Sequence, residues 1–286
     1  MGCTIDVEDL RRAIDAGEPV LVLDARNDSS DPTAPRRRWL EGRIPGAVHL
    51  DMGTVVSGPA RPDGSGGRNP MPTPAAFLAG LNAVGAHTGM RLVACDERME
   101  GVAARVWWIA RELGIDVEVL EGGLAAWRAA GGPVETGEPG PDAAPAPGDL
   151  PLPDGIDADV PVGSDGRGTV TPAQLAEPLP GLLLVDVRAP ARYRGDEEPL
   201  DAVGGHIPGA VNVPNVDAEG RATPPDVLAG LAAHDGPVVA SCGSGVSACL
   251  MLLRLAESGR EDALLYPGSW SEWVALGLPV ATGEER

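Results

Sequence analysis

The chain has 286 residues, which is about twice the length of a common domain, so we expect two domains. Hydrophobic residues make up 43% of it, enough to fill ordinary cores, which excludes wholesale disorder. Its 42 acidic residues outnumber 22 arginines, lysine is absent, and the net charge is −20. A surface this acidic is expected to repel nucleic acid and anionic membranes.

The sequence also lacks features of exported or membrane proteins. No apolar run is long enough to cross a bilayer, and the residues after Met1 do not form a signal-peptide pattern. The four cysteines, Cys3, Cys95, Cys242 and Cys249, are too few and too irregularly spaced for a disulfide framework. We therefore expect a cytoplasmic protein that binds neither nucleic acid nor membrane.

Residues 1–137 are predicted to form the first domain. Asp6 is placed to cap a helix over Val7–Ile14, and an apolar run over residues 19–24 indicates a buried strand. Further helices are predicted near Pro74–Val84, Val102–Leu113 and Leu124–Ala130. Unbroken apolar runs that alternate with helices are typical of an α/β domain, a parallel sheet with helices on both faces.

Residues 138–168 are rich in Pro, Gly, Asp and Ala and show no helical or strand periodicity. This composition predicts a solvated and fairly stiff linker.

Residues 169–286 are predicted to form the second domain, opened by a helix that Thr171 caps and that has Pro172 at its first position. Buried strands are predicted over Leu182–Val187, Ala210–Val213, Pro237–Ser241 and Ala263–Tyr266, and helices over Pro224–His234, Gly245–Ser258 and Trp270–Leu276.

The two halves repeat one pattern. The pair Asp24 and Arg26 corresponds to Asp186 and Arg188, 162 positions later. An Ile-Pro-Gly-Ala turn at residues 44–47 returns at residues 207–210, 163 positions later. Such even spacing indicates a tandem duplication, so both domains are expected to have the same fold.

The loop after the strand at residues 237–241 begins with Cys242. Ligands of open α/β sheets bind at the carboxyl ends of strands. Gly243 and Gly245 would let the loop amides turn inward, and the following helix would add its positive N-terminal potential. A thiol in this setting should ionise more readily than a free one and could hold a second sulfur atom. We interpret Cys242 as a reactive nucleophile and Cys249, within the next helix, as a core residue.

The first repeat lacks this thiol. Cys95 aligns with Ser241, and Asp96 aligns with Cys242. The first domain is therefore expected to be catalytically inactive.

Several motifs together give the chain a family resemblance. They are Asp186-x-Arg188, Arg192-Tyr193-x-Gly195, the Gly-His-Ile-Pro-Gly-Ala run at 205–210, the Cys242 loop, and Tyr266-x-Gly268-Ser269-Trp270-x-x-Trp273. The chain resembles the two-domain thiosulfate and 3-mercaptopyruvate sulfurtransferases of the rhodanese superfamily. The resemblance implies a transferase in which the loop cysteine takes a sulfane sulfur from a small anionic donor. The resulting persulfide passes the sulfur to cyanide or a thiol acceptor, and no cofactor takes part.

The resemblance also assigns roles to individual residues. Cys242 and Ser244 would be catalytic, and Ser244 either helps to activate the thiol or only caps the helix. Arg192 would clamp the donor anion, whereas Arg188 is either a donor ligand or a structural partner of Asp186. The remaining predicted donor-binding residues are Gly243, Gly245, Val246, Ser247 and Trp270. His206 corresponds to Arg43 of the inactive repeat and is expected to be structural.

The donor is less clearly indicated. The thiosulfate branch of the family usually carries cations after the cysteine, and here Gly243 and Ser244 stand there, as in the mercaptopyruvate branch. Three positions depart from the mercaptopyruvate branch: Leu200 replaces a second arginine, Gly53 replaces an aspartate, and a histidine is replaced around Asn69. We expect 3-mercaptopyruvate to be modestly preferred over thiosulfate.

Other functions fit the sequence less well. A cysteine phosphatase or arsenate reductase needs an arginine where Ala248 stands, and the loop lacks the Lys-Ser/Thr of a phosphate-binding loop. The four histidines and four cysteines show no metal-ligand spacing, so no metal is expected. The alternative that stays open is a non-enzymatic sulfur carrier or regulatory module that delivers the persulfide to a protein partner.

Overall fold

The computed structural model describes residues 2–28, 30–140, 146–177, 180–217 and 220–285. The chain forms two compact units, and their boundaries do not follow the repeat. Unit 1 consists of Met1–Gly58 and Pro72–Val162, and unit 2 consists of Pro59–Met71 and Gly163–Arg286. A short piece of the first half of the sequence, residues 59–71, is thus part of unit 2.

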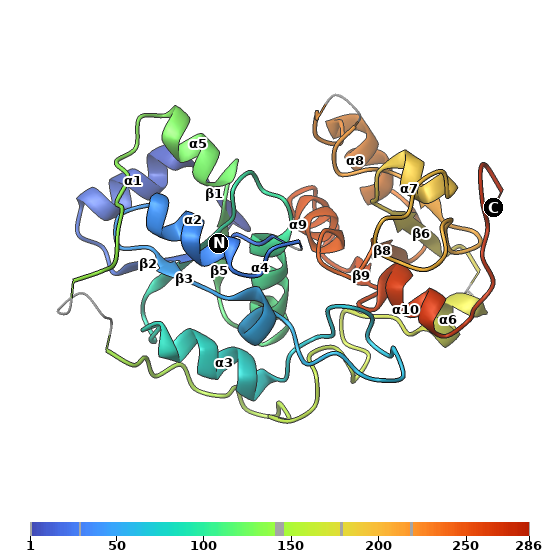
Figure 1. The fold of residues 1–286 in the computed structure, drawn as a ribbon, viewed down its shortest axis with the longest axis horizontal. Helices are drawn as coiled ribbons and strands as arrows, with labels where there is room; N and C mark the ends of the chain where they lie inside the picture. The colour runs from blue at the N-terminus through green and yellow to red at the C-terminus, as the bar shows by residue number, and fades with distance from the viewer. Residues whose placement is uncertain (1, 29, 141–145, 178–179, 218–219, 286) are drawn as a thin grey trace. The chain divides into compact units, whose positions relative to one another are not determined.

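Unit 1 contains a five-stranded sheet in the order β1-β5-β4-β2-β3, and every pairing in it is parallel (Figure 1). Its strands are β1 (Thr4–Ile5), β2 (Val20–Asp24), β3 (Val48–His49), β4 (Arg91–Cys95) and β5 (Val117–Leu120). Its helices are α1 (Val7–Asp15), α2 (Ala34–Glu41), η1 (Met52–Val56), α3 (Pro74–Ala83), α4 (Val102–Glu112) and α5 (Gly123–Ala129).

Unit 2 contains a four-stranded parallel sheet in the order β7-β6-β8-β9. Its strands are β6 (Leu183–Asp186), β7 (Val211–Asn212), β8 (Val238–Ser241) and β9 (Leu264–Leu265). Its helices are α6 (Pro172–Ala176), α7 (Pro190–Arg194), α8 (Pro225–Ala232), α9 (Ala248–Glu257) and α10 (Ser269–Ala275). The expected α/β fold, two parallel sheets flanked by helices, is confirmed.

Two of the predicted helix caps are present. The Asp6 side chain accepts a hydrogen bond from the Asp9 amide at 2.7 Å and so satisfies a free N–H of α1. Thr171 and Gln174 form a reciprocal capping box at the start of α6.

Helix α9 begins three residues later than the sequence predicts. Gly245 has a φ of 73°, which is incompatible with a right-handed helix, so residues 245–247 remain in the loop. The loop after Cys242 is therefore longer than expected, and more of its backbone amides are outside the helix.

The predicted linker, residues 138–168, has no helix or strand among its described residues. Part of it is nevertheless attached to unit 1. The Asn82 side chain bonds to the backbone of Leu150 in both directions, at 2.8 and 3.1 Å. The Val162 amide donates to Pro72 O at 3.0 Å, and the Val162 side chain is buried. Residues 148–162 thus pack on unit 1.

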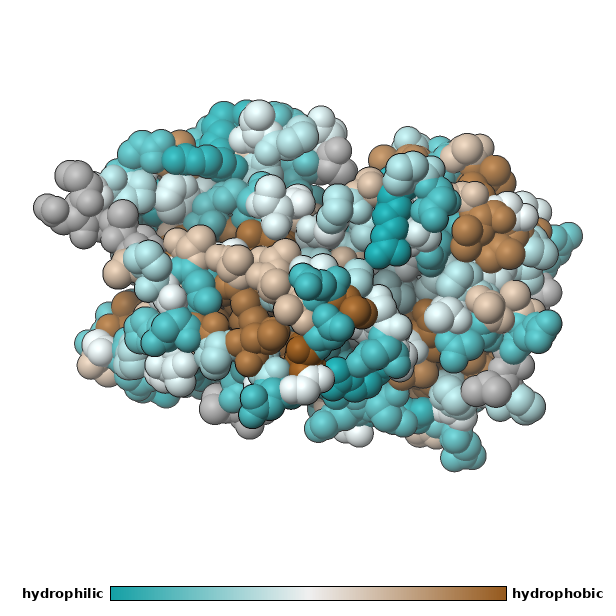
Figure 2. All heavy atoms as spheres, turned by 90° about the horizontal axis from the view of Figure 1, so that it is seen from below, coloured by the Kyte–Doolittle hydropathy of each residue, from teal (hydrophilic) through white to brown (hydrophobic). Residues whose placement is uncertain are grey.

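No helix in the described part of the chain is long and apolar enough to cross a membrane. On the face shown in Figure 2, hydrophilic residues are spread over both units and hydrophobic residues gather in separate patches.

Candidate active site

The first turn of α10 holds the Cys242 loop in place. The amides of Trp270 and Ser271 donate to the carbonyl oxygens of Cys242 and Gly243, at 3.1 and 2.9 Å. In the opposite direction, the Cys242 amide donates to Ser269 Oγ at 3.0 Å. Ser269 has a φ of 51°, a conformation that is uncommon for residues other than glycine. Strained backbone of this kind often occurs at functional sites, and here it brings the hydroxyl of Ser269 next to Cys242.

The loop itself requires a glycine at position 245. Besides its positive φ, a Cβ atom at this position would clash with the carbonyl oxygen of Pro267. Cys242 directly follows β8, and its side chain is 2% exposed. The sequence thus places the thiol at the carboxyl end of a central strand, as predicted.

The same turn of α10 also anchors the segment of residues 59–71. The Gly66 amide donates to Glu272 Oε1 at 2.7 Å, and the Arg68 amide donates to Ser271 Oγ at 3.0 Å. Gly67, with a φ of 69°, lies so close that a Cβ there would clash with Ser271 Oγ. Helix α10 therefore positions both the cysteine loop and a segment about 200 residues earlier in the sequence.

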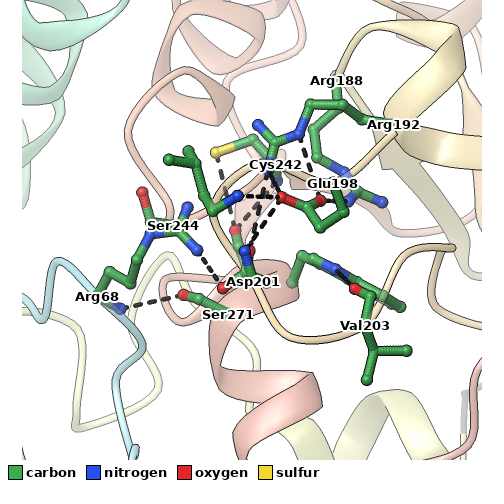
Figure 3. A network of polar contacts seen from close by, with 12 residues as sticks. Arg68, Arg188, Arg192, Glu198, Asp201, Val203, Cys242, Ser244 and Ser271 are labelled. Carbon is green, nitrogen blue, oxygen red and sulfur yellow. Dashed lines mark hydrogen bonds and ion pairs between the residues drawn. The ribbon is translucent and has the colours of Figure 1, made fainter. Parts of the chain in front are cut away.

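Two carboxylates hold two arginines beside Cys242 (Figure 3). Arg192 donates from Nη2 and Nε to Glu198, at 2.7 and 3.3 Å. Arg68 forms an ion pair through Nη1 with Asp201 Oδ1, and the other oxygen of Asp201 lies 3.8 Å from Arg192 Nη2. One carboxylate thus lies within ion-pair distance of both guanidinium groups.

Glu198 is ionised because its hydrogen bonds outweigh its burial. Burial alone would raise the pKa of this carboxyl, but the hydrogen bonds from Arg192 and the Leu200 amide lower it below its usual value. The negative charge on Glu198 keeps Arg192 in a fixed orientation.

Nitrogen atoms of both arginines also lie close to Gly243, and one of them, Arg192 Nη2, is the atom that donates to Glu198. A Cβ atom at Gly243 would lie 3.2 Å from Arg68 Nη2 and 3.4 Å from both Nη1 and Nη2 of Arg192. The absence of a side chain therefore lets two guanidinium groups approach the backbone next to the nucleophile.

Arg188 is buried and has several acceptors. It donates to both oxygens of Asp186 and to Gly205 O, and its Nη1 lies 3.4 Å from Glu198 Oε2. The face of its guanidinium stacks on the Trp270 ring at 4.8 Å.

The first repeat contains the same arrangement. Arg26 donates to both oxygens of Asp24 and to Gly42 O. Because this pair is present in a repeat without the loop cysteine, the arrangement in unit 2 favours the structural interpretation of Arg188 over donor binding.

Ser244 is in contact with the segment 59–71. Asn69 Nδ2 donates to Ser244 Oγ at 2.8 Å, so the hydroxyl acts as an acceptor and its own hydrogen points elsewhere. The contact brings Asn69, the residue expected near the position of the family's histidine, next to Ser244. An amide cannot accept a proton from Ser244 as a histidine would.

In the first repeat, the position of Cys242 is filled by Asp96. The amides of Leu124 and Ala125 donate to the carbonyls of Asp96 and Glu97, as those of Trp270 and Ser271 do to Cys242 and Gly243. The Asp96 carboxylate accepts hydrogen bonds from the loop amides of Glu100 and Gly101 and from the amide of Ala103 in the first turn of α4, at 3.1–3.2 Å. The loop of this fold thus surrounds an acidic side chain with backbone donors. Burial nevertheless raises the pKa of Asp96, and these amides only partly offset it.

Val246 and Ser247 are half-buried in the loop before α9, whereas His206, Trp270 and Cys249 lie in the core. His206 is fully buried, stacks on Tyr193 at 3.7 Å and bonds to Tyr193 O and Glu285 O, as expected for a structural residue. Trp270 is 1% exposed, and its indole donates to Val203 O at 3.0 Å. Cys249 is fully buried in α9. Cys95 of the first repeat is buried at the end of β4, and this burial raises the pKa of its thiol. Among the described residues, no group of three or more His, Cys, Asp or Glu side chains could hold a metal ion.

Comparisons with known proteins show which family the chain resembles. The rhodanese-like domain model matches the chain twice, over residues 6–130 and 171–276. SseB of Mycobacterium tuberculosis, assigned as a thiosulfate sulfurtransferase, is 37% identical over 278 residues, which cover 94% of this chain and 93% of SseB. A Pseudomonas aeruginosa protein assigned as a 3-mercaptopyruvate sulfurtransferase is 40% identical over 281 residues, which cover 93% of each chain.

The chain also resembles a solved structure. SseA of Escherichia coli, described as a 3-mercaptopyruvate sulfurtransferase with the rhodanese fold, superimposes with a TM-score of 0.72 at 28% identity. The match covers 95% of this chain and all of SseA. The chain belongs to the rhodanese family. The family and fold expected from the sequence are therefore confirmed.

Proposed function

We propose that Cys242 is the sulfur-carrying nucleophile of this sulfurtransferase. The observation that carries this proposal is the equivalence of Cys242 and Asp96. The first repeat shows that the loop amides can surround an acidic group at this position, and the corresponding amides of unit 2 include those of Val246 and Ser247. They would stabilise the thiolate and the persulfide that replaces it.

The first half-reaction transfers one sulfur atom to Cys242. The thiolate attacks the outer sulfur of thiosulfate, the S–S bond breaks, and sulfite leaves with the electron pair. With 3-mercaptopyruvate, the C–S bond breaks instead, and the electron pair stays on carbon as the enolate of pyruvate, which then takes up a proton. In both cases Cys242 becomes a persulfide. The hydroxyl hydrogen of Ser244 can donate toward the charge that develops on the donor.

The second half-reaction restores the thiol. Cyanide or a thiolate attacks the outer sulfur of the persulfide, the S–S bond breaks, and the Cys242 thiolate leaves with the electron pair. The products are thiocyanate or a new persulfide on the acceptor. We propose this reaction for the cytoplasm, where thiol acceptors stay reduced.

Arg192 binds the anionic end of the donor in this proposal. Its side chain is 21% exposed, whereas that of Arg188 is 2% exposed, so Arg192 is the more accessible guanidinium. A guanidinium can bind a carboxylate or a sulfonate through two parallel hydrogen bonds. Because residues 243–247 of the loop carry no cation, we keep the prediction of a modest preference for 3-mercaptopyruvate.

The test combines intact mass with turnover. The purified protein is incubated with each donor, and we expect a gain of one sulfur atom that cyanide removes as thiocyanate. Cys242→Ser should lose both the mass gain and turnover, whereas Cys249→Ser, the matched control in the same unit, should keep both. An unchanged mass gain in Cys242→Ser would overturn the proposal. Sulfur gain without turnover of small acceptors would indicate the non-enzymatic carrier instead.

A further inference from the structure

We propose that Arg68 is a donor-binding residue and forms, together with Arg192, a two-arginine clamp for the anionic head group of the sulfur donor. This inference rests on the proposed function, because it takes Cys242 as the nucleophile. Its central observation is that Arg68 comes from the segment of residues 59–71, which lies in unit 2 although it belongs to the first half of the sequence.

The two guanidinium groups face the same point. Arg68 Nη2 and Arg192 Nη1 and Nη2 all lie within 3.4 Å of the position that a Cβ of Gly243 would occupy. Gly243 follows the nucleophile directly in the sequence. A donor whose transferred sulfur reaches Cys242 would thus have its charged end close to both cations.

Asp201 shows that a single anion can reach both arginines. Its Oδ1 pairs with Arg68 Nη1, and its Oδ2 lies 3.8 Å from Arg192 Nη2. A carboxylate or sulfonate on the Gly243 side could therefore also contact both groups. Of the three nitrogen atoms near Gly243, Arg192 Nη2 also donates to Glu198, whereas Arg68 Nη2 and Arg192 Nη1 are not the atoms that bond to these carboxylates.

The segment of residues 59–71 is held in a way that fixes Arg68. The Arg68 amide donates to Ser271 Oγ, and the Gly66 amide donates to Glu272 Oε1. The Asn69 side chain donates to Ser244 Oγ. Three anchors on unit 2 thus limit the movement of its backbone. The side chain is nevertheless 32% exposed, so a ligand can reach it.

Arg68 also supplies a second positive charge next to Leu200, a position that carries no charge in this chain. Leu200 stands where the mercaptopyruvate branch has a second arginine, and Leu200 is half-exposed and apolar. Arg68 pairs with Asp201, the neighbour of Leu200, so a second cation is restored here from a different part of the chain.

The experiment measures kcat and KM for 3-mercaptopyruvate and for thiosulfate in Arg68→Ala, Arg68→Lys and Arg61→Ala. Loss of a charge-assisted hydrogen bond should raise the KM of Arg68→Ala about 10- to 100-fold for both donors. Arg68→Lys should have an intermediate KM, because it keeps the charge but not the planar fork. Arg61→Ala, an exposed position on the same segment, should match the wild type.

A fourth variant, Asp201→Asn, distinguishes donor binding from a purely structural ion pair. If Arg68 binds the donor, removal of the competing carboxylate should leave the donor KM equal or lower. If Arg68 only ties the segment to Asp201, Asp201→Asn should raise the KM as much as Arg68→Ala, which would overturn the proposal. A KM of Arg68→Ala within about twofold of the wild type for either donor would also overturn it.

The intact mass of the protein, which reports sulfur bound to Cys242, distinguishes failure of the clamp from failure of the proposed function. At saturating donor, Arg68→Ala should still gain one sulfur atom on Cys242, because the nucleophile is unchanged. If the wild type gains no sulfur, the proposed function is wrong. If the wild type gains sulfur and Arg68→Ala has the same donor KM as the wild type, only the two-arginine clamp is wrong.

Discussion

Asp96 and Cys242 occupy the same position in two copies of one loop, and their main chains make the same hydrogen bonds to α5 and α10. The carbonyl contacts of the loop are thus alike in both copies, whereas the side chain that the loop surrounds differs. A carboxylate cannot accept a sulfur atom, whereas a thiolate can. The inactivity that we propose for unit 1 needs only this exchange, with no change in the fold.

Arg188 and its counterpart Arg26 should contribute similarly to stability. Replacement of either by alanine leaves a buried aspartate without its partner, so we expect Arg26→Ala and Arg188→Ala each to cost about 3–5 kcal/mol in the free energy of unfolding. Denaturant unfolding of the variants checks this. If Arg188→Ala left stability unchanged while Arg26→Ala reduced it, Arg188 would not be a structural residue.

Arg192 should affect donor binding far more than Arg188 does. We expect Arg192→Ala to raise the donor KM about 10- to 100-fold, because a charge-assisted hydrogen bond to the donor is lost. Arg188→Lys should change KM little in the folded protein, and Arg194→Ala, an exposed neighbour paired with Asp196, serves as the control. Steady-state kinetics decide between these roles; equal KM effects of Arg192→Ala and Arg188→Lys would mean that they are misassigned.

Gly243 should be needed for binding and Gly245 for folding of the loop. A methyl group at Gly243 would push against both guanidinium groups, so Gly243→Ala should raise the donor KM several-fold with little loss of stability. Gly245→Ala combines a positive φ with a clash against Pro267 O and should lower the melting temperature.

The control for both glycines is Gly230→Ala in α8, where a Cβ would meet nothing within 4 Å. It should stabilise the helix by about 0.5–1 kcal/mol. A Gly243→Ala variant with wild-type KM would contradict the close approach of the two arginines.

Glu198 should make unit 2 sensitive to acid. Its pKa is lower in the folded protein than in the unfolded chain, so its stabilising effect is complete above the unfolded value near 4.5. That effect is lost as the pH falls below this value and through the folded pKa. We expect the melting temperature of Glu198→Gln to depend less on pH in this acidic range than that of the wild type.

Glu197→Gln, the exposed neighbouring substitution, is the matched control and should retain the wild-type dependence. Parallel pH profiles of the wild type and Glu198→Gln would show that Glu198 contributes no acid sensitivity.

The net charge of −20 predicts how salt affects donor binding. Distant carboxylates repel an anionic donor, and salt screens them beyond about 8–10 Å, whereas the contacts with Arg192 and the loop amides are short. The donor KM should therefore stay constant or fall between low and physiological ionic strength. A steady rise of KM with salt, at constant kcat, would instead indicate long-range attraction.

The fold and the position of Cys242 at the end of a strand could be predicted because their signals are local. Apolar runs, caps and the 162-residue spacing of Asp24 and Asp186 identify both sheets. The strand, the cysteine and the glycines that follow it lie within a few residues of each other. Gly245 lies in this stretch too, but its residue type alone did not show that its φ is positive and that α9 begins only at Ala248.

The rest of the site depends on contacts between residues far apart in the sequence. Arg68 and Asp201 are separated by 133 positions, and Arg68 and Ser271 by 203. No periodicity links such residues, so Arg68 was missed. Ser269 was seen only as part of a motif, because its role depends on a backbone φ of 51° that places its hydroxyl at the Cys242 amide. The Arg-Asn pair at residues 68–69, next to a run of glycines, was the available signal.

The assignment of residues 59–71 to unit 2 has a consequence for the evolution of the gene. If Arg68 binds the donor, as we propose, the copy without the thiol could not be discarded after the duplication, because it encodes Arg68 and Asn69. A shortened gene for residues 163–286 alone would encode Cys242 but neither Arg68 nor Asn69. Selection for one reaction would then preserve both halves of the gene. The first repeat would be retained because it encodes residues of unit 2.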